Sequence, residues 1–149
     1  MARFSGGAGA GVSAVEWTPV LVNVTVGSGT VSSSAYESGD IVFGFLSFAV
    51  AADSAISGAV SVNLPSAAVS AAPLSVVGAY TQNSTGDVFS LGGTTNGSAL
   101  AFDVKKIAGL TYDALESGEF VTADSVDATH PVAYASGDVL TISFMYTKA

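Results

Sequence analysis

Apolar and polar residues alternate with a period of two along much of this chain, as they do in β-strands that bury one face. In the segment WTPVLVNVTV, residues 17–26, valine recurs at every second position. We expect these valines to face one side of a half-buried strand, with Leu21, Asn23 and Thr25 on the other side. The sequence GSG that follows predicts a turn, and residues 30–36 are expected to form the hairpin partner.

The same reading predicts strands further along the chain, each bounded by Gly, Pro, Asp or Ser residues. These predicted strands are residues 41–52, 60–64, 74–81, 88–91, 99–104 and 139–146, with a further short strand at 120–122. The sequence GGTTNG at 92–97 predicts a tight turn, and residues 112–116 a single helical turn. Eight or nine short strands without a long helix are typical of an antiparallel β-sandwich, so we predict an all-β fold.

Residues 41–52 differ from the other predicted strands because both of their faces are apolar. Such a strand lies between two layers or inside an oligomer. Phe43, Phe45 and Phe48 are therefore candidate oligomer-interface residues. In the last predicted strand, the even-numbered residues of 140–146 are expected to face the core, and the hydroxyl-bearing residues between them to face outward.

One short pattern occurs three times: AYESGDIV at 35–42, AYTQNSTGDVF at 79–89 and AYASGDVL at 133–140. Each Gly-Asp pair stands directly before an apolar run. We interpret the pattern as a turn, in which Gly adopts a positive φ and Asp bonds backbone N–H groups that have no ladder partner. Tyr36 and Tyr134 would then pack at the end of the sandwich with their hydroxyls in water. The alternative interpretation is a shared ligand or ion site.

The N-terminal segment is small, Gly-rich and nearly uncharged. Residues 1–15 are expected to form an extended arm that needs a partner to become ordered, and residues 16–149 the β-sandwich domain. The segment contains no apolar core of the kind that a secretory signal has, so we expect synthesis and initial folding in a cytosol.

Charged residues make up 11% of the chain, compared with roughly 25% in a typical soluble domain. Hydrophobic residues make up 49%. A monomer has to cover its surface with polar groups, and this chain has few ionised groups with which to do so. We infer that part of its surface is covered by copies of itself or by another protein. A neutral surface of Ser, Thr and Gly is the alternative.

The net charge of −8 and the presence of only four basic residues argue against nucleic acid and anionic membranes as partners. The longest apolar run, residues 41–52, is shorter than the ~20 residues that a membrane-spanning helix needs. The chain has no cysteine, which excludes disulfides, thiol nucleophiles and Cys-based zinc sites.

Catalytic motifs are also lacking, so we predict that the protein is not an enzyme and that it needs no cofactor or metal. His130 precedes Pro131, and no GxSxG sequence is present to supply a nucleophile. Five carboxylates lie within residues 113–127. They could bind calcium, but the spacing of a DxDxDG loop is absent, and a solvated acidic loop is the simpler interpretation. No carboxylate pair is marked by its surroundings as that of a glycosidase.

Several motifs within residues 17–65 resemble a structural module of tailed-bacteriophage virion proteins. They are Trp17-Thr18-Pro19, Gly27-Ser28-Gly29, Tyr36, Gly39-Asp40-Ile41 and Ser61-Val62-Asn63-Leu64-Pro65. The resemblance implies a jelly-roll-like β-sandwich that is usually trimeric and occurs in capsid decorations, head fibres and tail-fibre tips. It brings no catalytic residues with it.

From this resemblance we expect a homotrimeric capsid decoration (cement) or head-spike protein on the exterior of the virion, with the major capsid protein as its partner. Arg3, Phe4, Val12 and Trp17 are the candidate anchoring residues. The alternative function is a tail-fibre or receptor-binding adhesin tip, which would recognise a host glycan or protein through the loops at 82–97 and 112–130.

Overall fold

The computed structural model describes residues 11–69, 73, 75–106 and 122–149. These residues form ten β-strands. The strands are β1 (Ser13–Val15), β2 (Leu21–Thr25), β3 (Thr30–Ser38), β4 (Ile41–Ala49), β5 (Ala55–Asn63), β6 (Ser75–Thr81), β7 (Val88–Thr95), β8 (Ala99–Lys106), β9 (Thr122–Ser125) and β10 (Val139–Thr147). The prediction of an all-β fold is confirmed.

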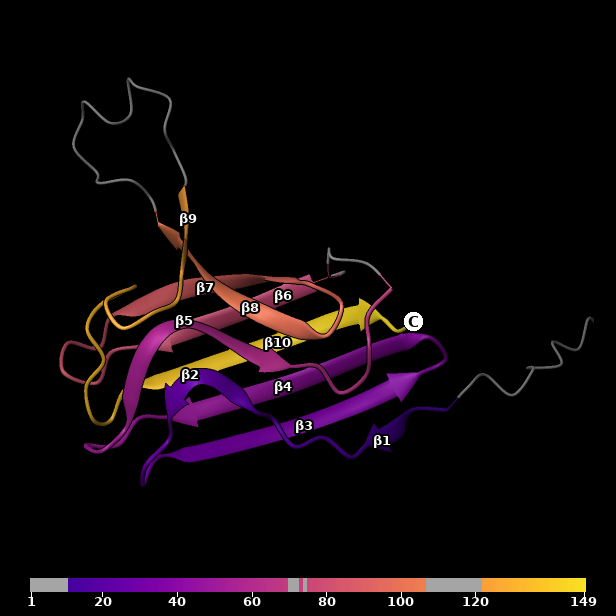
Figure 1. The fold of residues 1–149 in the computed structure, drawn as a ribbon, viewed down its shortest axis with the longest axis horizontal. Coiled ribbons are helices and arrows are strands. Elements are labelled where there is room, and N and C mark those ends of the chain that lie inside the picture. Colours follow the sequence, from indigo (N-terminus) through magenta and orange to yellow (C-terminus); the bar gives the residue numbers. More distant parts are fainter. Residues whose placement is uncertain (1–10, 70–72, 74, 107–121) are drawn as a thin grey trace, which may run out of the picture.

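The strands join into one antiparallel sheet in the order β1-β3-β4-β10-β6-β7-β8-β5-β2, with β9 paired to β8 beside this path. The hydrogen-bonded ladder is continuous and does not divide into two separate sheets. The sheet instead curls, and in Figure 1 the β8-β5-β2 part lies over the β3-β4-β10 part. Curling lets a single sheet cover its own apolar face, which two packed sheets would otherwise do for each other.

An aromatic contact joins the β2 end of the curled sheet to strand β10 in its middle part. Trp17, just before β2, packs edge-on against Phe144 of β10, with the ring centroids 5.5 Å apart. The indole N–H donates a hydrogen bond of 3.1 Å to the carbonyl of Asn63 at the end of β5. Gly44 lies opposite Phe144 on β4, and any Cβ at this position would collide with the Phe144 ring. Glycine is therefore required there by close packing.

The core lies inside the curl and is formed by the alternate residues that face inward. Its fully buried members include Val42, Leu46, Val62, Tyr80, Leu100, Phe102, Val126, Leu140, Ile142 and Tyr146. The even-numbered residues of the last strand do face the core, as expected from the period of two. Adjacent strands repeat the same alternation, so their inward-facing residues meet in one core.

Strand β2, the first strand that the alternation predicted, departs from the predictions in two ways. Strand β2 pairs with β5 and not with β3, so the expected hairpin of residues 17–36 does not form. The register shifts between Val22 and Val24, and Asn23 has a φ of 61°. Leu21 and Val24 pack on the core while Val22 is exposed, because this bulge reverses the alternation that the regular valine spacing predicted.

Strand boundaries account for the remaining differences. Residues 13–15, predicted as part of the arm, pair as β1 with β3. Strand β7 continues through Gly92 and Gly93 to Thr95, so the predicted turn at 92–97 is shorter and starts later. Strand β9 lies at Thr122–Ser125, slightly after the predicted 120–122. The helical turn predicted at 112–116 lies outside the described residues.

Candidate interaction surface

The three repeated patterns form turns, as the sequence predicted. Their glycines Gly39, Gly86 and Gly137 have φ values of 59°, 76° and 92°. All three lie in the left-handed region that favours glycine. The backbone of the pattern is therefore repeated, whereas the environments of its side chains differ from one copy to the next.

Asp138, in the third copy, is completely buried. Its carboxylate accepts hydrogen bonds from the hydroxyl of Tyr80 and from the backbone N–H groups of Asn83 and Ala135, at 2.8 Å for each backbone donor. Burial by itself would raise the pKa of Asp138, but these three donors outweigh it and lower the pKa below its ordinary value. The carboxylate links the β6–β7 loop to the turn before β10. The bonding role predicted for the Gly-Asp aspartates is thus seen for this one.

Two tyrosines pack around this carboxylate. The rings of Tyr80 and Tyr134 lie edge to face, with their centroids 4.8 Å apart. Burial raises the pKa of both hydroxyls, with hydrogen bonding to Asp138 adding to the effect at Tyr80. The Tyr134 hydroxyl donates a hydrogen bond of 3.4 Å to the carbonyl of His130. It therefore bonds to the protein, whereas the sequence pattern predicted that it would lie in water. The group is fully hydrogen-bonded and offers no free acid or base for chemistry.

His130 lies in a turn closed by Asp127. The carboxylate oxygen Oδ1 of Asp127 accepts bonds from the backbone N–H of Thr129 and His130 and lies 3.1 Å from the His130 Nδ1. The Thr129 N–H, with the His130 and Thr129 side chains, lowers the pKa of Asp127 to about 2. This arrangement is that of a capped turn. Within the described ranges, no group of three or more His, Cys, Asp or Glu residues could hold a metal ion.

The outer face of β3, β4, β10 and β6 carries no charged residue. The strand registers place the following residues on it: Thr30, Ser32, Ser34, Tyr36, Ser38, Ile41, Phe43, Phe45, Ser47, Ala49, Ser75, Val77, Ala79, Thr81, Val139, Thr141, Ser143, Met145 and Thr147. We call this surface the uncharged face. It extends over four adjacent strands of a chain whose net charge is −8.

Large apolar side chains gather in two adjacent rows near the middle of the uncharged face. Tyr36, Phe43 and Met145 are paired across adjacent strands, and the rings of Tyr36 and Phe43 stack with centroids 5.7 Å apart. Phe45 and Val77 lie in the next row, on either side of Ser143. Tyr36, Phe45 and Met145 are 38–40% exposed and Val77 is 66% exposed. These are unusual exposures for such residues on adjacent strands.

Of the predicted interface residues, Phe43 and Phe45 lie on this face, whereas Phe48 does not. Phe48 points into the core and is 1% exposed, because it lies three positions after Phe45 and so faces the other side of β4. Sequence reasoning did not select Met145 or Val77. The period-two alternation that assigned their neighbours to the core could have identified both.

Of the four predicted anchoring residues, only Val12 and Trp17 lie within the described residues. Arg3 and Phe4 lie outside the described residues. Val12 is 64% exposed, just before β1. Trp17 is partly buried and packs on the protein's own core through Phe144 and Asn63, and its role as an anchor stays a prediction.

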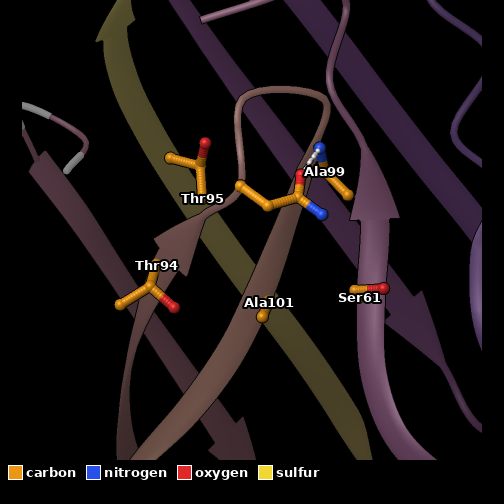
Figure 2. A pocket seen from close by; sticks show the side chains of 6 residues that line it. Ser61, Thr94, Thr95, Ala99 and Ala101 are labelled. Carbon is orange, nitrogen blue, oxygen red and sulfur yellow. Dashed lines mark hydrogen bonds between the residues drawn. The ribbon is translucent and has the colours of Figure 1, made fainter. Parts of the chain in front are cut away.

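The opposite outer surface, over β5, β7 and β8, has a shallow pocket of about 190 Å³. Figure 2 shows Ser61, Thr94, Ala99 and Ala101 around it, with the tip of the β7–β8 hairpin at its rim. The side-chain oxygen of Asn96 at this tip accepts bonds from the backbone N–H groups of Ser98 and Ala99. The pocket is lined only by neutral residues, which suits a neutral polar ligand and not an ionic one.

The comparisons with known proteins give no relative for this chain: no family model, no curated protein and no solved structure matches it. Within the described part of the chain, no helix has the length and apolar character needed to cross a membrane.

Proposed function

We propose that the protein is structural and works through protein–protein contacts. The observation that supports this most directly is the uncharged face, with Tyr36, Phe45, Met145 and Val77 exposed on a regular sheet. A large apolar patch on a sheet surface is costly in water and is typical of a surface that another protein covers. The low content of charged residues, 11%, supports the same conclusion.

The specific role that we propose is decoration of a bacteriophage capsid, as a cement or head-spike protein on the exterior of the virion. The motifs of residues 17–65 that resemble virion modules support this role, and the all-β fold is compatible with it. The protein would act as a homotrimer whose partner is the major capsid protein. Several identical contacts on one shell would multiply the strength of each individual contact.

The segment before β1 is the proposed attachment device. Strand β1 pairs with β3 and forms the edge of the sheet next to the uncharged face. Val12 is exposed immediately before this strand. Arg3 and Phe4 precede it and would supply a charged and an aromatic contact to the shell.

The experiment compares phage particles assembled with and without this protein for their resistance to heat and osmotic shock. Particles without the protein should release DNA at a lower temperature, and an antibody against it should label the capsids of complete particles. Arg3→Ala combined with Phe4→Ala should abolish capsid attachment while leaving the oligomer intact. Labelling of tails alone, or unchanged stability of particles without the protein, would refute capsid decoration.

An adhesin tip is the second candidate function, and the neutral pocket at Ser61, Thr94 and Asn96 favours it. Part of this pocket belongs to the predicted binding loop at 82–97. A neutral sugar is the class of ligand that hydroxyl and amide side chains recognise. Binding of the purified protein to immobilised neutral glycans, abolished by Thr94→Val, would support this function over decoration.

A further inference from the structure

We infer that the uncharged face is the surface through which copies of this chain associate in the proposed homotrimer, with the face of each copy buried against the faces of the other two. The inference rests on the proposed structural role and specifies its partner surface. The residues at its centre are Phe43, Phe45 and Met145, with Val77 beside them.

Charge distribution is the first reason for choosing a second copy as the occupant. No carboxylate of the described strands points outward from this face: Asp40, Asp53, Asp87 and Asp127 are in turns, Asp103 is on β8, and Glu37 faces the other side of β3, where it pairs with Lys148. Contacts between identical copies through the strand ends would bring these acidic groups within the screening length of about 8 Å. Contact through the uncharged face keeps them apart.

The chemistry of the face is also self-complementary. Apolar rings occupy the rows of Tyr36 and Phe45, while Ser32, Ser47 and Thr141 form the next row. Hydroxyl groups both donate and accept hydrogen bonds, so a row of them can pair with a copy of itself. A basic partner would be attracted to the acidic turns and not to this face, because the face carries no charge.

The area of the face is sufficient for a specific contact. Four strands about 4.8 Å apart, each with four or five outward residues about 6.8 Å apart, give a flat area on the order of 500 Å². Because side chains project from this plane, the accessible area is larger and approaches the roughly 800 Å² per partner of a standard interface. Exposed aromatic and Met side chains near the centre are the residue types that contribute most to such interfaces.

The test places a negative charge on the face and measures the mass of the particle in solution by sedimentation velocity. Ser143→Asp is the main variant: Ser143 is exposed between Phe45 and Val77, so the change removes no packing. Phe45→Asp is the second variant. Both should dissociate the wild-type oligomer and raise its dissociation constant at least 100-fold.

Val20→Asp combined with Val22→Asp is the matched control. These valines are 60% and 47% exposed but lie by β2, away from the uncharged face. The control variant carries the same type of added charge and should remain an oligomer. Circular dichroism on every variant confirms that the fold is retained.

A second measurement locates the contact directly. Since the chain has no cysteine, Ser143→Cys introduces a single site for a spin label, and dipolar spectroscopy measures the distance to the same label in another copy. Both labels would lie in one interface whose longest dimension is about 30 Å, so we expect them to be less than about 30 Å apart. A label at Ser57→Cys on β5 should be further from its copy.

The outcomes separate this inference from the proposed function. A monomeric wild-type protein, or an oligomer that survives both charged variants, would overturn the inference. If the variants dissociate as expected but the wild-type oligomer does not decorate capsids, the interface stands and the virion role fails. If the variant monomers still bind capsids, self-association and attachment use different surfaces.

Discussion

Two turns of this protein have almost the same sequence and different surroundings. The turn before β4 reads AYESGDIV and the turn before β10 reads AYASGDVL. Both place glycine at positive φ, at Gly39 and Gly137. Asp40 is exposed, whereas Asp138 is completely buried and accepts bonds from three donors. A local pattern can therefore specify the backbone of a turn without specifying whether its side chains are structural.

The difference arises from what packs on each turn. The turn before β10 meets Tyr80 and Asn83, which arrive from β6 and the loop after it. The turn before β4 lies near the open edge of the sheet, where the main contact is with the C-terminal segment: the Lys148 N–H donates to the carbonyl of Asp40. Only the turn before β10 therefore removes its carboxylate from water.

The largest expected effect in this comparison is that of removing the buried carboxylate. Asp138→Ala leaves the Tyr80 hydroxyl and the backbone N–H groups of Asn83 and Ala135 without an acceptor, which should lower the free energy of unfolding by about 3–5 kcal/mol. Asp40→Ala should change it by less than about 0.5 kcal/mol, as for other surface substitutions. Urea unfolding followed by the fluorescence of Trp17 measures both. Equal effects would show that the buried bonds contribute nothing beyond the turn itself.

The glycines of the two turns provide the next comparison. A Cβ at Gly137 would lie 2.6 Å from the amide nitrogen of Asn83, whereas a Cβ at Gly39 would meet nothing within 4 Å. Gly39→Ala should therefore cost only the strain of the left-handed conformation, about 1 kcal/mol. Gly137→Ala should cost about 2–3 kcal/mol, because a displaced Asn83 adds to that strain. Thermal unfolding of both variants would show whether Asn83 can move without loss.

Removal of single hydroxyls should have a smaller effect. Tyr80→Phe leaves Asp138 with its two backbone donors and should lower the free energy of unfolding by about 1–2 kcal/mol. Tyr36→Phe keeps the ring that stacks on Phe43 and should be close to neutral. The same urea titration applies, and a neutral Tyr80→Phe would place the stabilisation with the backbone donors alone.

The dependence of the free energy of unfolding on pH tests the contribution of the Asp138 carboxylate, because acid protonates this group without removing the side chain. Because the pKa of Asp138 is lowered in the folded protein, its contribution is present above the ordinary value of 3.8 and is lost as the pH falls through the folded pKa. Asp127, with a pKa of about 2, acts in the same direction. Asp103, whose pKa burial raises, acts in the opposite direction.

Urea midpoints measured from pH 6 down to pH 2 should therefore fall, and Asp138→Asn should reduce this fall. An unchanged slope in the Asn variant would mean that the other carboxylates account for the acid sensitivity. At the alkaline end, the raised pKa values of Tyr80 and Tyr134 should make the protein less stable as the pH rises above 10, since the unfolded chain ionises first.

Much of the fold could be predicted from the sequence, and the candidate surface only in part. Periodicity identified the core positions of the last strand. Phe48, which is buried, was selected as an interface candidate together with Phe43 and Phe45 because residues 41–52 are apolar on both faces, so composition did not distinguish inside from outside. The strand pairing of β2 could not be predicted, because which strands pair depends on contacts far apart in sequence.

Taken alone, the amino-acid sequence determined which segments become strands and where the chain turns, since alternation and glycine act over a few residues. Only the tertiary structure decided which faces became surface. Curling of the sheet brought Trp17 onto Phe144 and enclosed Asp138, and it left Phe45 and Met145 outside. Whether a position is buried depends on which strands cover it. Those strands are far away in the sequence, so no pattern within a few residues specifies burial.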